Sequence, residues 1–290
     1  MPGQFSITPT GPFSLAQAAG FGFGPREAED FDGTMRLAFC ADDLTHGVGV
    51  ALTEDDAGVI HGTVQGDAET LDVRTQTARI LSLDHDGADW LEVGGRDPVI
   101  GRLQQQYAGL RPVLFHSPYE AAAWSVISAR RGRRQAMNTR DRISEALGER
   151  FTVAGHAMWA FPTPERLLTV TETSDLGPMR VERLRAVAAA ATNGALDADR
   201  LRAMGADSAI IELQELPGIG PFYAMLIAIR ATGFADATPP EEGRVLVAAQ
   251  RQYGDAMPDY AALVEHSKVW SPFRVWATVL LRVSEERRVH

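Results

Sequence analysis

The sequence is poor in the residues that most often supply nucleophiles and soft metal ligands. Its 290 residues include one cysteine, Cys40, and one lysine, Lys268, against 27 arginines. A lone cysteine excludes an intramolecular disulfide and any zinc or iron–sulfur site built from cysteines. A single lysine leaves almost no side-chain amine for Schiff-base chemistry. We therefore expect no metal site made by side chains.

Long hydrophobic runs are absent as well. No stretch approaches the about 18 consecutive apolar residues that a membrane span needs. The start, Met1-Pro2-Gly3-Gln4, has neither the basic residues nor the apolar centre of a signal peptide. A hydrophobic content of 45% still supplies a sizeable core. These features predict a cytoplasmic protein with one large or two modest domains and no membrane partner.

An excess of positive charge is also missing, since the net charge is −10. Residues 1–112 contain seven Arg against seventeen Asp and Glu, whereas residues 113–290 hold 21 basic and 21 acidic residues. This asymmetry predicts two functional halves with a boundary near residue 112. A neutral second half attracts nucleic acid weakly, so any such binding would depend on local patches and backbone amides.

The first half has the pattern of an α+β domain. Apolar residues alternate or cluster in four segments that predict antiparallel strands: 35–39, 47–52, 59–64 and 70–74. Turns rich in Gly and Asp separate these segments, and Ser14 to Ala19 predicts a short helix. From Pro98 onward the pattern is helical to the end of the chain.

The first helix of the second half begins with a capping box. Ser117 is the expected N-cap, Pro118 the first helical residue, and Glu120 follows three residues after the cap. Trp124 then shares one face with Ile127. It is either a core residue or part of a pocket lining.

A cluster of arginines follows that helix. Four of them are Arg130, Arg131, Arg133 and Arg134, and Arg140 and Arg142 lie close behind, with Asp141 as the one acid among them. Such a cluster is either a solvated face or a contact for phosphate, because arginine forms paired hydrogen bonds to phosphate oxygens.

The most informative stretch is Leu216-Pro217-Gly218-Ile219-Gly220. Two glycines around one apolar residue allow a tight turn between helices and leave backbone N–H groups uncovered, where a phosphate can bind. Pro221 fits the first position of the next helix, and Gly233 fits its end. The buried face of that helix repeats at i, i+3, i+4 and i+7, in Ala224, Ile227, Ala228 and Ala231. The alternative is a plain turn between two packed helices.

The segment from Leu213 to Arg230, followed by Pro239-Pro240-Glu241-Glu242, resembles the helix-hairpin-helix (HhH-GPD) DNA glycosylases of base-excision repair, DNA-3-methyladenine glycosylase II above all. Further similarity lies in residues 117–148, 161–165, 176–177 with 183–189, and 270–274. In all, it spans roughly residues 113–290. The resemblance implies a mainly α fold preceded by an N-terminal α+β domain with an antiparallel sheet. It also implies DNA binding through the hairpin residues Leu216, Gly218, Ile219 and Gly220.

The resemblance also implies a catalytic carboxylate. Breaking an N-glycosidic bond passes through a cation-like sugar, which a nearby carboxylate stabilises. The family has an aspartate where this chain has Glu242, whose oxygens reach about an ångström further, an error that can cost about a hundredfold in rate. Glu241 is the second candidate. Alternatively, both glutamates only cap the following helix.

The pocket implied by the resemblance is altered. Bifunctional relatives carry a Schiff-base lysine where this chain has Phe222, so cleavage would be direct hydrolysis by water. Phe222 and Tyr223, with Trp124, are expected to line a pocket for a base flipped out of the duplex. Arg282, however, replaces a tryptophan of the alkylpurine enzymes, and Leu226 replaces a tyrosine.

The sequence therefore predicts a monomeric, monofunctional glycosylase that removes alkylated purines such as 3-methyladenine from damaged double-stranded DNA, in the cytoplasm with the chromosome. No cofactor is expected beyond a structural monovalent cation at the hairpin carbonyls. A noncatalytic DNA-binding relative that lost the aspartate is the alternative, and a helical protein–protein module is a third reading.

Overall fold

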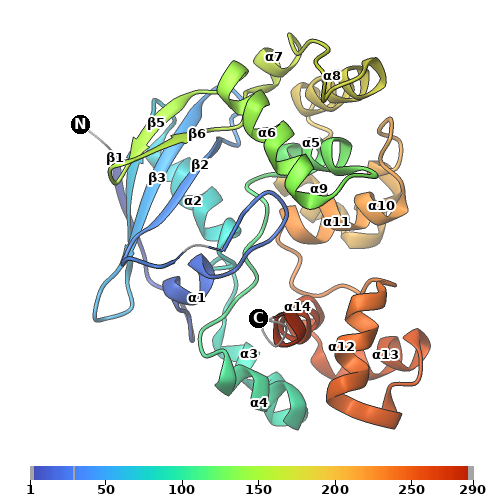
Figure 1. The fold of residues 1–290 in the computed structure, drawn as a ribbon. Helices are drawn as coiled ribbons and strands as arrows, with labels where there is room; N and C mark the ends of the chain where they lie inside the picture. The colour runs from blue at the N-terminus through green and yellow to red at the C-terminus, as the bar shows by residue number, and fades with distance from the viewer. Residues whose placement is uncertain (1–2, 29, 287–290) are drawn as a thin grey trace.

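The structure, a computed structural model, describes residues 3–28 and 30–286. Four antiparallel strands form a sheet of order β1-β4-β3-β2, which lies on one side of the molecule in Figure 1. The strands are β1 (Gly3–Ile7), β2 (Met35–Cys40), β3 (Gly47–Glu54) and β4 (Ile60–Gln65). Three of the four predicted strands are confirmed in this sheet. The predicted short helix is also present, as α1 (Leu15–Ala19), with Ser14 Oγ accepting a hydrogen bond from the Gln17 N–H.

The strand predicted at residues 70–74 is wrong, because this segment begins helix α2 (Thr70–Ile80). Leu71 and Val73 suggested alternation, yet Leu71 is 68% exposed while Val73 is buried. The buried positions Val73, Thr77 and Ile80 instead recur at helical spacing. This helix packs against β1, a strand that the sequence reading missed.

The predicted helical second part is confirmed, with one interruption. A two-stranded hairpin, β5 (Arg150–Val153) and β6 (His156–Trp159), lies on the main sheet. Gly49 permits this contact, since a β-carbon there would lie 2.8 Å from a Val153 methyl and 2.9 Å from the Phe151 Cβ. The helices are α3 (Ala88–Arg96), α4 (Pro98–Gln106), α5 (Pro118–Ser128), α6 (Arg133–Leu147), α7 (Pro164–Leu167), α8 (Pro178–Thr192), α9 (Ala198–Met204), α10 (Ala206–Leu213), α11 (Pro221–Ala231), α12 (Gly243–Tyr253), α13 (Tyr260–Ser267), the 3-10 turn η2 (Lys268–Trp270) and α14 (Arg274–Glu286).

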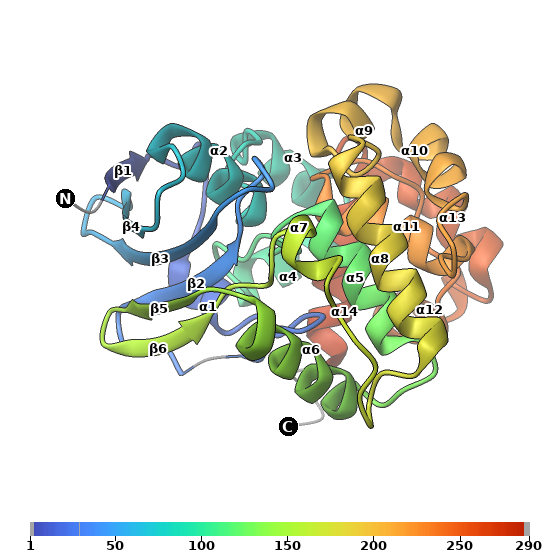
Figure 2. The same ribbon diagram turned by 90° about the horizontal axis from the view of Figure 1, so that it is seen from above.

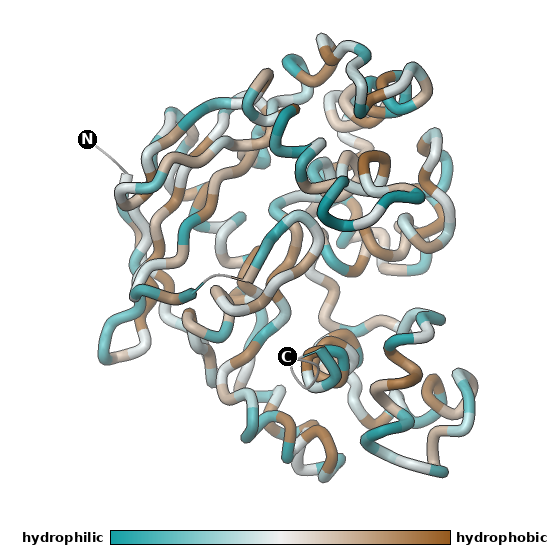
Figure 3. The backbone as a smooth tube through the Cα atoms, viewed as in Figure 1, coloured by the Kyte–Doolittle hydropathy of each residue, from teal (hydrophilic) through white to brown (hydrophobic). Residues whose placement is uncertain are grey.

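Two hydrophobic cores hold the molecule together. The first combines the sheet and α1–α4 with α12–α14, and the second is made by α5–α11. The two helical groups are separate in Figure 1, and Figure 2 shows the sheet at one side of the molecule. Figure 3 shows hydrophobic stretches on the strands and a long hydrophilic stretch on α6. Packing thus joins early and late parts of the chain, and the division into 1–112 and 113–290 stays a prediction.

A buried carboxylate connects the early part of the first core to its late part. Asp97 Oδ2 accepts hydrogen bonds from Trp270 Nε1 and Tyr253 Oη, both at 2.7 Å, and lies 2.9 Å from His266 Nε2. Burial opposes the charged form, but these hydrogen bonds lower the pKa of Asp97 below its ordinary value. α4 is thereby fastened to α12–η2.

Helix α5 begins as predicted, but its capping box is only half formed. Ser117 Oγ accepts from the Glu120 N–H at 3.1 Å. The Glu120 carboxylate, in contrast, accepts from the Cys40 N–H at 3.0 Å and lies 3.0 Å from His116 Nδ1. The glutamate therefore ties α5 to the sheet.

Across the described ranges, no helix has the length and apolar character of a membrane span.

Candidate active site

The hairpin lies between α10 and α11, with the geometry expected from its two glycines. Gly218 has φ +87, a conformation that glycine adopts without strain. The Ile219 N–H donates to the Leu216 carbonyl at 3.0 Å, and the Ile219 side chain is 3% exposed in the second core. Both glycines are exposed. Helix α11 begins at Pro221, as predicted.

The start of α11 is open to solvent. Gly220 occupies the N-cap position, and a β-carbon added there would meet no atom within 4 Å. The first N–H groups of a helix have no partner inside it. This turn can therefore hold an anion on uncovered backbone amides.

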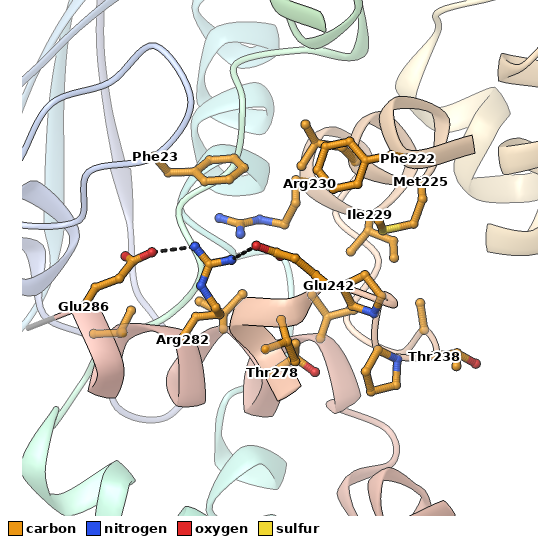
Figure 4. Close-up of a pocket in the computed structure, with 18 of the residues that line it drawn as sticks. Phe23, Phe222, Met225, Ile229, Arg230, Thr238, Glu242, Thr278, Arg282 and Glu286 are labelled. Atoms are coloured by element: carbon orange, nitrogen blue, oxygen red, sulfur yellow. Dashed lines mark hydrogen bonds and ion pairs between the residues drawn. The ribbon is translucent and has the colours of Figure 1, made fainter. Parts of the chain in front are cut away.

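A cavity of about 110 Å³ lies next to the hairpin. Its walls come from α11, the 237–240 connection, the start of α12, α14 and an early segment at residues 21–23 (Figure 4). The hydroxyl of Tyr260 donates to the Pro239 carbonyl and so fixes the connection. Three stretches far apart in sequence, at residues 21–23, 222–245 and 275–286, thus meet at one cavity.

Glu242 points its carboxylate into this cavity. It sits at the N-cap of α12, yet its side chain makes no capping hydrogen bond. Its Oε1 instead lies 2.5 Å from Arg282 Nη1, and Arg282 Nη2 lies 2.5 Å from Glu286 Oε1 (Figure 4). Glu241 is exposed and lies outside the cavity lining. Of the two glutamates, only Glu242 lines the cavity.

A second guanidinium lies above the first. Arg230 packs 3.7 Å over the ring centroid of Phe23 and donates to the Val113 carbonyl at 2.8 Å. Burial, with repulsion from Arg282, lowers the pKa of Arg230 to about 9, while Glu286 and Glu242 oppose that shift. Arg230 therefore remains charged at neutral pH. The cavity combines two guanidinium groups and two carboxylates with aromatic walls.

The predicted pocket residues divide into two groups. Phe222, 51% exposed, and Arg282 line the cavity. Tyr223 does not, and its hydroxyl lies 3.4 Å from Ser128 Oγ. Trp124 is 7% exposed in the second core, so its interpretation as a core residue is the one the packing supports.

Four aromatic or charged residues of the lining were not predicted from the sequence. Phe21 and Phe23 come from the acidic first part of the chain, and Arg230 and Glu286 from α11 and α14. The signal was present as Gly-Phe-Gly-Phe-Gly at residues 20–24, an aromatic pair in a glycine-rich loop. Glu286 also follows Arg282 by four residues, the spacing of a helical ion pair.

The predicted DNA-contacting arginines differ in what they touch. Arg130 and Arg134 are exposed, and their guanidinium groups form no hydrogen bond with a residue in the described ranges. Arg131 donates to Thr139 Oγ1 at 3.1 Å and to the Asp175 carbonyl. Arg133 donates to the carbonyls of Gly24 and Arg26, at 3.0 and 2.5 Å. Arg133 thus holds the loop that carries Phe23.

Comparison with solved structures identifies the architecture. The chain is similar to a 3-methyladenine DNA glycosylase from Archaeoglobus fulgidus, with a TM-score of 0.78, 20% identity and 98% of each chain covered. The protein has the helix-hairpin-helix DNA glycosylase fold. This fold also covers 97% of an 8-oxoguanine glycosylase/lyase from Clostridium acetobutylicum and 97% of the present chain, with a TM-score of 0.65 and 17% identity. The predicted resemblance and fold class are confirmed.

In sequence, the chain is similar to a curated protein, the probable bifunctional transcriptional activator/DNA repair enzyme AlkA of Mycobacterium tuberculosis. The two are 30% identical over 229 residues, which is 76% of this chain and 44% of the relative. The chain therefore spans less than half the length of the curated relatives it matches. No family model matches the chain.

Proposed function

We propose that the protein is a monofunctional DNA glycosylase that hydrolyses the N-glycosidic bond of alkylated purines, such as 3-methyladenine, in damaged double-stranded DNA. The observation that carries this proposal is the carboxylate of Glu242 in a cavity that opens beside the hairpin. Phe222, in the first turn of α11, lies between the phosphate-binding turn and the cavity. A strand held at the hairpin can thus present a flipped base to Glu242.

The aromatic walls would hold the base. Phe222 and Phe23 both line the cavity, and stacking of one base on an aromatic ring contributes about 1–3 kcal/mol. Alkylated purines that carry positive charge are also attracted to aromatic faces. These two side chains therefore repay part of the free energy lost when the base leaves the duplex stack.

Glu242 would act while the bond breaks. The C1′–N bond cleaves with its electron pair leaving on the purine, so an alkylated purine that was cationic departs neutral. Positive charge develops on the sugar, where the carboxylate stabilises it. A water oxygen then bonds to C1′, and Glu242 accepts the proton released from that water. The products are a free base and an intact abasic site.

Arg282 is a positioning residue in this scheme. Its guanidinium binds one oxygen of Glu242 and is itself held by Glu286. This contact fixes a side chain that is one methylene longer than aspartate. Because Arg282 pairs with two carboxylates, its positive charge is offset. Arg282 can therefore orient Glu242 without cancelling the attraction between this carboxylate and the sugar cation.

Strand cleavage through a Schiff base is not expected. Phe222 stands at the position of the lyase lysine, and Lys268 pairs with Glu265 at 2.5 Å on η2, outside the cavity lining. We also propose that the protein works as a monomer in the cytoplasm. A monovalent cation at the hairpin carbonyls fits one observation: the Leu216 oxygen accepts one hydrogen bond and keeps a second lone pair.

The test is excision from a duplex with a single 3-methyladenine analogue or other alkylated purine. We expect release of the free base, strand breakage only after alkali, and no covalent adduct on borohydride treatment. Efficient trapping would overturn the hydrolytic mechanism. Tight DNA binding without release of any alkylated purine would favour the noncatalytic alternative.

A further inference from the structure

An arginine without an assigned role lies directly on the hairpin turn. A β-carbon placed on Gly218 would be 2.6 Å from Arg183 Cδ and 3.0 Å from its Cζ. Arg183 belongs to α8, so its side chain reaches across to cover one side of the turn. Its guanidinium nitrogens form no hydrogen bond or ion pair with residues that the structure describes. The charge at this position is therefore available to a ligand.

Two more arginines gather at the same place. Arg180, one turn earlier in α8, donates to the Ala129 carbonyl at 2.9 Å, which brings the end of α5 against the start of α8. Arg131 lies two residues after Ala129 in the chain. Ser128, in turn, touches Tyr223 of α11. The end of α5 and the starts of α8 and α11 thus converge at the hairpin, on the side of the molecule away from β5 and β6 (Figure 2).

We call Arg131, Arg180 and Arg183 the hairpin arginine patch. Burial, and then repulsion from Arg131 and Arg183, lowers the pKa of Arg180, so the three charges act on one another. Asp175, whose carbonyl accepts from Arg131, has its carboxylate paired with Arg142 outside the patch. Within the described residues, no carboxylate forms an ion pair with the patch. A bound anion would reduce the repulsion between these three positive charges.

We propose that the hairpin arginine patch binds a backbone phosphate of duplex DNA, next to the phosphate held by the hairpin N–H groups. This inference rests on the proposed DNA contact of the hairpin. Guanidinium groups form paired hydrogen bonds to phosphate oxygens, and Arg183 has all its donors free for them. Residues 113–290 carry no net charge, yet the patch would let them bind DNA. It concentrates positive charge beside the backbone amides of the hairpin.

The proposal is tested by the salt dependence of binding to an undamaged duplex, measured between 50 and 200 mM salt. Each lost phosphate contact should lower the slope of log K against log salt by about 0.9. We expect Arg183→Gln to lose about one such contact and to bind about fivefold more weakly at low salt. Arg183→Lys should keep the slope. Arg150→Gln, an exposed position on β5, is the matched control for the change in net charge.

Arg180→Gln also removes the hydrogen bond to Ala129, so its melting temperature must be compared with that of wild type. Arg183→Glu supplies a second variant that leaves this bond intact, and it should weaken binding further than Arg183→Gln. If wild type binds the duplex and both Arg183 variants keep its slope and affinity, the patch makes no phosphate contact, while the proposed function stands. If wild type binds no duplex, both proposals fail.

Discussion

The hairpin and the cavity lie two residues apart in sequence, at Gly220 and Phe222, yet they are built in different ways. The hairpin uses backbone amides and one buried side chain, Ile219, all within five residues. The cavity depends on charged and aromatic side chains from three distant segments, including Phe23 and Arg282. A local turn can therefore be retained while the cavity beside it changes its chemistry. We expect mutations to separate binding of DNA from action on the base.

The largest effect should come from Glu242→Gln, which keeps the size of the side chain and removes its charge. Excision should fall by at least about a hundredfold, because the carboxylate stabilises charge that develops only as the bond breaks. Affinity for an abasic duplex should stay within about twofold of wild type. Single-turnover excision and a binding titration measure the two quantities.

Glu241→Gln is the matched control for this variant, since Glu241 is exposed outside the cavity. Undiminished excision by Glu242→Gln would remove this residue from the mechanism and shift attention to Glu241.

Gly220→Trp should affect the hairpin rather than the cavity. A side chain at this open position would cover the amides at the start of α11, and loss of hydrogen bonds to a charged phosphate should weaken DNA binding about ten- to a hundredfold. Gly220 is the right position because Gly218, with φ +87 and Arg183 against it, would be strained by any side chain.

The control is Gly95→Trp on α3, another position where added atoms meet open space. Fluorescence anisotropy reports the affinity and a melting curve the folding. A folded Gly220→Trp protein that binds DNA like wild type would rule out the turn as the phosphate site.

Arg282→Gln should have an intermediate effect and would sharpen the role of the altered cavity. Without its partner, Glu242 loses a fixed position, so kcat should fall about tenfold while KM changes little. Arg282→Lys should recover part of the loss. Arg251→Gln breaks a comparable 2.5 Å ion pair, to Glu285, outside the cavity lining. Faster excision by Arg282→Gln would instead mean that the arginine restrains the carboxylate.

Phe23→Leu should have the smallest effect. Losing part of a stacking surface worth about 1 kcal/mol should raise KM about fivefold with little change in kcat. Phe13→Leu is matched, because Phe13 also lies under a guanidinium, that of Arg111 at 5.9 Å, but does not line the cavity. Equal KM values for both variants and wild type would mean that the early segment does not contact the base.

The hairpin could be predicted from sequence because its determinants are close neighbours. Gly218 needs a left-handed conformation, Pro221 starts a helix and Gly233 follows its end with φ +86. The segment at residues 70–74 shows the limit of the same reasoning. Leu71 and Val73 alternate over too short a window, and the helical period becomes visible only when Thr77 and Ile80 are included.

The cavity could be predicted only in part. Glu242, Phe222 and Arg282 were predicted from the resemblance to the glycosylases, and all three line the cavity. Phe23 lies about two hundred residues away in sequence, and nothing in local pattern indicates which distant helix it will approach. Tyr223 shows the opposite error, since it neighbours Phe222 but turns toward Ser128.

The joint core of early and late segments has a consequence for the order of folding. All the helices of the second core precede α12 in the chain, so during synthesis they can pack, with the hairpin, before Glu242 and Arg282 have emerged. The cavity closes only when α14 packs against α4 and meets the Phe21–Phe23 loop. During synthesis the hairpin would thus form before the cavity. The last step of folding would be the one that brings Glu242 and Arg282 into place.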